Sequence, residues 1–71
     1  MGTQNEIIES IMNGKINAEQ LAIVEMLSTQ ERPDLDEEAA MFCVDLWLGN
    51  TLSDIEALLL YGHILKRNPF Y

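Results

Sequence analysis

The sequence has little of what small proteins use as internal cross-links. Cys43 is the only cysteine and His63 the only histidine among 71 residues. No intramolecular disulfide can therefore form, and no set of metal ligands is apparent. A lone cysteine is also typical of a reducing compartment. Because a chain of this length buries only about 60% of the surface that its unfolded form exposes, its stability must come from regular helix packing, from association, or from both.

Basic residues are also scarce. Twelve Asp and Glu face four Lys and Arg, which gives a formal net charge of −8. Direct binding to nucleic acid and adsorption to anionic membranes both depend on Lys and Arg, so we expect neither. The charge favours a partner protein with a basic surface, whose approach the acidic residues would steer. The alternative is that the surplus acid only keeps the chain in solution.

Long apolar runs are missing as well. No run approaches the roughly 18 residues that cross a bilayer. The polar and acidic stretch MGTQNEIIES at the N-terminus is unlike a signal peptide. We therefore expect a cytoplasmic protein whose residues 1–71 form a single helical domain.

Patterns that carry chemistry are sparse. A nucleophile–base pair of Cys43 and His63 would require contact between them and a third, orienting group, and a lone cysteine on an apolar helix is more often inert packing. No glycine-rich phosphate loop is present. The sequence predicts no enzyme, no catalytic residue and no cofactor.

One acidic stretch faintly resembles a calcium loop. Asp34, Asp36, Glu38 and Asp45 have the spacing of positions 1, 3, 5 and 12 of an EF-hand. Ala39 stands at position 6, where the sharp turn of such a loop needs glycine. We therefore interpret these residues as helix-capping and solvated side chains, and we expect no bound metal.

Helix start and stop patterns predict four helices, over residues 4–12, 18–29, 37–48 and 54–67. Three of the starts have capping-box pairs, which are Thr3/Glu6, Asn17/Gln20 and Ser53/Glu56. Asp36 is the expected cap of the third helix, and the expected stops are Asn13-Gly14, Gly49-Asn50 and Asn68-Pro69. No strand pattern occurs. The predicted fold is all-α: a small antiparallel bundle of about four short helices that self-associates.

The second half of the chain is apolar on more than one side. In AAMFCVDLWL, residues 39–48, Asp45 is the only side chain that is not apolar. A surface helix needs a single apolar stripe, so we expect an apolar interface that contains Phe42, Trp47, Leu60 and Tyr61. Three arrangements remain open: a two-fold homodimer through the third and fourth helices, a site for a different protein, and a third helix that lies centrally, wrapped by the others.

The predicted function is that of an acidic protein–protein interaction module. It would regulate or inhibit a protein by docking on a basic surface, such as one that normally holds nucleic acid. The alternative is a homo-oligomeric structural or assembly subunit with no separate ligand. The acidic residues expected to face the partner are Glu31, Asp34, Asp36, Glu37 and Glu38.

The C-terminal tail has two interpretations. Asn68-Pro69-Phe70 resembles the short peptide motif that EH domains bind. The favoured alternative is that Phe70 and Tyr71 fold back and cover part of the bundle.

Overall fold

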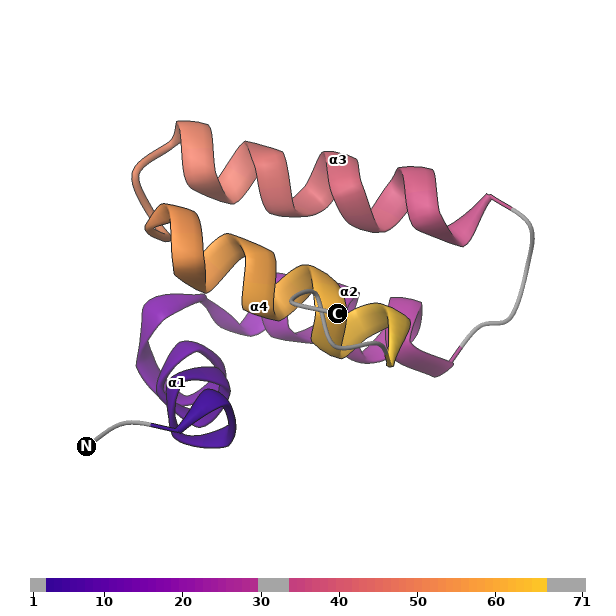
Figure 1. Cartoon of the computed structure of the whole chain (residues 1–71). Coiled ribbons are helices and arrows are strands. Elements are labelled where there is room, and N and C mark those ends of the chain that lie inside the picture. The colour runs from indigo at the N-terminus through magenta and orange to yellow at the C-terminus, as the bar shows by residue number, and fades with distance from the viewer. Residues whose placement is uncertain (1–2, 30–33, 67–71) are drawn as a thin grey trace.

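The computed structural model describes residues 3–29 and 34–66 of the chain. These residues form four α-helices and one π-helical turn, and no strand occurs among them (Figure 1). The elements are α1 (Gln4–Ser10), the π-helical turn η1 (Ile11–Lys15), α2 (Ala18–Thr29), α3 (Leu35–Leu48) and α4 (Asp54–Leu65). The all-α bundle predicted from the sequence is confirmed.

Two helix starts have the predicted capping box. The Gln20 backbone N–H donates to Asn17 Oδ1 at 2.8 Å, and the Asn17 N–H donates to Gln20 Oε1 at 2.9 Å. Before α4, the Ser53 N–H donates to Glu56 Oε1 at 2.9 Å, and the Glu56 N–H donates to Ser53 Oγ at 3.4 Å. Each pair satisfies two backbone groups that a helix start otherwise leaves without partners.

The first helix does not stop at Asn13-Gly14 as expected. It continues as the π-helical turn η1, in which the Ile16 N–H donates to the Ile11 carbonyl at 3.2 Å. Ile11 and Ile16 are both buried in the core, whereas Asn13 and Gly14 are exposed. The wider turn places the two isoleucines on the core side, and this burial overrides the local stop signal.

Both ends of α2, the end of α3 and the start of α4 lie at the predicted residues, and two other boundaries differ by two residues. α3 begins at Leu35, so Asp34 and not Asp36 precedes it, because Leu35 packs against the core. α4 ends at Leu65, where Lys66 adopts the left-handed conformation with φ 57°. Asn50 adopts the same conformation after α3, with φ 62°. Positions 67–71 lie outside the described residues, so the structure tests neither interpretation of the tail.

The fourth helix, not the third, is central. α4 packs against α1, α2 and α3, and α3 lies antiparallel beside it on the outside of the molecule (Figure 1). The largest fully buried side chains are Ile11, Val24, Leu60 and Ile64. The arrangement with a central third helix is therefore wrong. No helix within the described ranges is long and apolar enough to span a bilayer.

Candidate interaction surface

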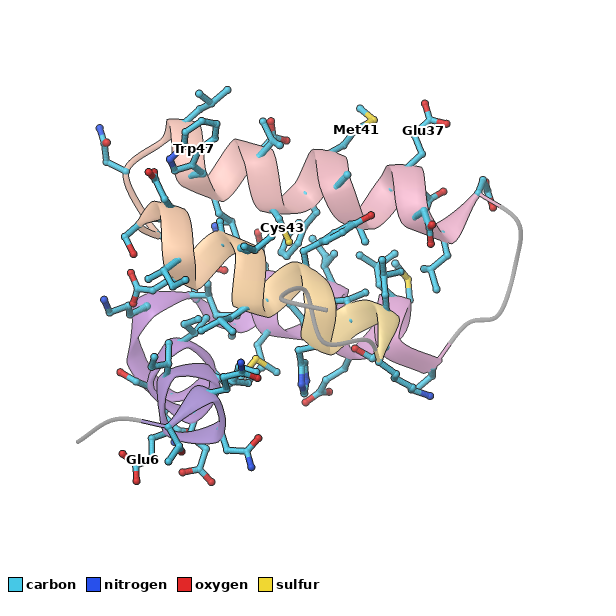
Figure 2. All side chains as sticks on the ribbon, in the orientation of Figure 1. Glu6, Glu37, Met41, Cys43 and Trp47 are labelled. Atoms are coloured by element: carbon cyan, nitrogen blue, oxygen red, sulfur yellow. The ribbon has the colours of Figure 1, made fainter. Side chains whose placement is uncertain are left out.

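Helix α3 has two apolar sides that face different surroundings. Ala39, Cys43 and Leu46 are buried against the core. Met41 and Leu48 lie on the opposite, outward side and are 63% and 68% exposed. Figure 2 shows Met41 pointing away from α4 while Cys43 points toward it. Packing on α4 therefore buries only one of the two stripes.

The exposed apolar residues of α3 continue onto α4. We call this set the α3–α4 apolar face and define it as six side chains, each 40% or more exposed. They are Met41, Val44, Trp47, Leu48, Ile55 and Leu58. Their exposed fractions correspond to on the order of 500 Å² of surface, which is within the range of the largest apolar patch on a typical soluble monomer, and such patches are often functional.

A groove runs between α3 and α4, shares Val44, Trp47 and Leu58 with this face and has a volume of about 430 Å³. Its floor consists of small or short side chains, namely Ala40, Cys43 and Ala57. Its walls are larger and come from both helices: Val44, Trp47, Leu58 and Tyr61. Asp54 is its single charged residue. A second hollow of about 460 Å³ adjoins it at the α3–α4 turn, and Trp47, Asp54 and Ile55 line part of that hollow.

Trp47 is fixed at the junction of the two hollows. Its indole Nε1–H donates to the Asp54 carboxylate in the first turn of α4. The bond satisfies the only polar atom of the side chain and connects α3 to α4. The ring is nevertheless 43% exposed. Trp47 is therefore a restrained aromatic side chain with an exposed apolar surface, and such side chains are common among the residues that dominate binding energy.

The predicted apolar interface is only partly brought together. Trp47 belongs to the α3–α4 apolar face, and Tyr61 lines the groove. Phe42 is half-buried and packs against the core. Leu60 is 0% exposed, so its assignment to a surface is corrected: it lies on the inner side of the central helix.

Sequence reasoning missed five members of the face. They are Met41, Val44, Leu48, Ile55 and Leu58. The spacing of 41, 44 and 48 is that of a helical stripe, and it lies opposite the stripe of 39, 43 and 46. The sequence therefore contains the pattern of that second stripe.

Acidic residues border the face. Asp34 precedes α3, and Asp36, Glu37 and Glu38 lie in its first turn, whereas Glu31 lies outside the described residues. Glu37 shares the outward side of α3 with Met41 (Figure 2). The exposed Asp45 follows Met41 by one helical turn.

The basic side chains of the described segments lie elsewhere. Lys15 forms a salt bridge with Glu56, and Lys66 follows the end of α4. His63, in the last turn of α4, is exposed. Over residues 3–29 and 34–66, the charged side chains placed beside the outward side of α3 are therefore acidic, namely Glu37 and Asp45.

The structure also places the residues that the sequence offered as candidates for chemistry. Burial raises the pKa of the Cys43 thiol to about 12, so the thiol is protonated at neutral pH. The residues with calcium-loop spacing lie along α3 and its start, so they form a helix and not a loop. Over residues 3–29 and 34–66, no group of three or more His, Cys, Asp or Glu is placed to hold a metal ion.

Comparisons with protein-family models, with curated proteins and with solved structures find no significant match.

Proposed function

We propose that this protein is a non-enzymatic protein-binding module that docks through the α3–α4 apolar face. The partner would carry Lys and Arg around an apolar patch, and occupancy of that patch would regulate or inhibit it. The basic surface of a nucleic-acid-binding protein has this chemistry. The observation that carries the proposal is six exposed apolar side chains grouped on two adjacent helices and bordered by acidic residues.

The composition of the face supports binding to another protein. Protein interfaces commonly combine an apolar centre with a polar rim. Here Trp47 is the largest apolar side chain of the face, and the acidic Glu37 and Asp45 lie beside its α3 residues. Burial of on the order of 500 Å² of apolar surface at about 25 cal/mol per Å² yields roughly 12 kcal/mol before the cost of association. The apolar residues would then provide most of the affinity, while the acidic residues would increase the association rate and the selectivity for a basic partner.

A homodimer through the same face is the second candidate. The exposed apolar area favours it, since a two-fold contact would bury the face of each copy. The charge opposes it, because two chains of net charge −8 would bring acidic edges together. This candidate stays an alternative with its own test, the molecular mass in solution.

The proposal is tested by photocrosslinking in the cells that produce the protein. A benzophenone amino acid replaces Leu48 on the face in one variant and Met26 on α2 in a matched control. Both side chains are well exposed, at 68% and 49%, so neither replacement disturbs the core. We expect a crosslink to a second, different protein from position 48 and none from position 26.

The captured protein is then purified and titrated against the chain. Leu48→Glu should weaken binding at least about tenfold, whereas Met26→Glu should leave it unchanged. Crosslinks of equal yield from both positions would refute the assignment of the face. A crosslink from position 48 only to a second copy of the chain would replace the proposal with the homodimer.

A further inference from the structure

We infer that the groove between α3 and α4 accepts an amphipathic helix of the partner, with Lys or Arg along the edge of its apolar stripe that faces α3. This inference rests on the proposed function and adds the shape and charge of the bound element. It would place the partner's apolar anchors over Ala40, Cys43 and Ala57, and its basic edge beside the acidic residues of α3.

The shape of the groove favours a helix. Its floor is made of small or short side chains on two antiparallel helices, while Val44 and Leu58 stand above it as walls. From Ala40 to Trp47 the floor and walls extend about 10 Å along α3, or roughly two helical turns. A third helix laid in this groove would insert side chains at i, i+3 or i+4, and i+7.

The lining disfavours a small polar ligand. Pockets for metabolites combine apolar walls with several converging polar groups. Here Asp54 is the single charged group, and its carboxylate already accepts the indole N–H of Trp47. The apolar stripe of a helix has no polar group at its centre that needs a partner, so it fits this lining better than a small polar ligand does.

The charges around the groove select the edges of the bound helix. Glu37 lies at the N-terminal end of the outward side of α3 (Figure 2), and the exposed Asp45 follows Met41 of that side by one helical turn. Lys15 is paired with Glu56, and Lys66 lies beyond the end of α4. Acidic edges on the partner would meet like charge, whereas basic edges would meet opposite charge.

Trp47 makes the inference directly measurable. It is the only tryptophan of the chain, and it lines the groove. A ligand that enters the groove must therefore change the intrinsic fluorescence of the protein, without any label.

The probes are three synthetic peptides without tryptophan. The first has Leu at i, i+4, i+7 and i+11 with Lys on both flanks, the second has Glu in place of every Lys, and the third is a scramble of the first. We expect the Lys peptide to shift Trp47 emission saturably, with a Kd at least about tenfold lower than that of either control peptide. Raising the salt concentration from about 50 to 500 mM should weaken binding of the Lys peptide severalfold.

Three protein variants, one of them a control, locate and reverse the interaction. Val44→Glu, in the groove wall, should weaken binding of the Lys peptide at least about tenfold, whereas Ile23→Glu on α2 should not. Val44 and Ile23 are similarly exposed, at 42% and 38%. The double variant Glu37→Lys/Asp45→Lys leaves the apolar face intact and should now prefer the Glu peptide.

The outcomes separate this inference from the function on which it rests. Equal binding of the Lys and Glu peptides, or of neither, overturns the inference, and so does a Lys-peptide interaction that Val44→Glu leaves intact. A position-specific crosslink from Leu48 to another protein would still support the proposed function in each of those cases. Charge-selective binding that Val44→Glu abolishes and the double variant reverses supports the inference.

Discussion

At the scale of single residues, identical side chains on one helix have opposite roles. Ile55 and Ile64 both lie on α4, yet Ile55 is 46% exposed and Ile64 is 1% exposed. Leu58 and Leu60 differ in the same way, since Leu58 lines the groove and Leu60 is fully buried. The sequence could not separate them because α4 is apolar on nearly all sides, and hydrophobicity alone does not say which side meets the core.

Conservative substitutions of these isoleucines test the division. We expect Ile64→Val to lower the free energy of unfolding by about 0.5–1.5 kcal/mol, because it removes a buried methyl group. Ile55→Val should change it by less than about 0.5 kcal/mol, since that methyl group is already in water. Urea unfolding followed by circular dichroism measures both. Equal losses for the two variants would contradict the assignment of the core to the inner side of α4.

The Cys43 thiol offers a second test at this scale. Because burial raises its pKa to about 12, roughly one thiol in ten thousand is ionised at pH 8. We expect the native protein to react with iodoacetamide at least about a thousandfold more slowly than the urea-unfolded chain. The rate is followed by mass spectrometry. Rapid alkylation of the native protein would show that the floor of the groove opens readily.

At the scale of the elements, local capping chemistry predicted most of the helix boundaries. The Asn17/Gln20 and Ser53/Glu56 pairs are side-chain-to-backbone interactions over three residues, so the sequence contains all of their determinants. The π-helical turn η1 could not be predicted in that way. It exists because Ile11 and Ile16 are both buried against residues distant in the sequence, and such burial is decided by packing and not by propensity.

An ion pair connects η1 to the start of α4. Lys15 Nζ contacts Glu56 Oε2, and Glu56 also accepts the Ser53 N–H in the capping box. The hydrogen bond from Lys15, together with that from the Ser53 backbone, lowers the pKa of Glu56. Glu56 therefore has two roles, because it caps one helix and holds a second element against it.

Removal of Lys15 should change how the free energy of unfolding depends on pH, because Glu56 then loses its ion pair. Since the pKa of Glu56 is lower in the folded chain than in the unfolded chain, its ionised form stabilises the fold above about pH 4.3, and this contribution is lost as the pH falls through the folded-state pKa. We expect Lys15→Met to cost about 0.5–1 kcal/mol at pH 7 and progressively less in acid. Urea unfolding across the pH range measures the difference.

Lys66→Met is the matched control for the ion pair. It removes the same charge from the end of α4 without touching Glu56. An NMR titration of the Glu56 side chain should show its pKa rising in Lys15→Met and unchanged in Lys66→Met. Equal effects of the two substitutions would mean that net charge, and not the contact, stabilises the fold.

At the scale of the whole molecule, the excess of apolar surface in the second half of the chain could be predicted, but its location could not. The sequence shows that α3 and α4 have more apolar residues than one interface between them can cover. Which apolar residues remain exposed depends on which helix is central. The contacts of α4 with α1, α2 and α3 make α4 the central helix. With α4 in the middle, the outer stripe of α3 remains exposed.

The exposed apolar surface of α3 and α4 and the net charge of the chain together predict its oligomeric state in solution. At neutral pH and low salt we expect a monomer of 8.1 kDa, because repulsion between chains of net charge −8 opposes contact of the apolar faces. As the pH falls toward the isoelectric point of about 4.2, the repulsion disappears and the faces should associate. Sedimentation equilibrium over a concentration series measures the mass, and circular dichroism of the same samples reports whether the helices persist.

Two charge-matched variants assign that association to a surface. Leu48→Lys and Met26→Lys change the net charge equally, but only Leu48 belongs to the α3–α4 apolar face. Near the isoelectric point Leu48→Lys should stay largely monomeric, whereas Met26→Lys should associate as the unmodified chain does. A dimer at pH 7 that Leu48→Lys dissociates would instead mean that the apolar contact exceeds the repulsion, and the face would then serve self-assembly.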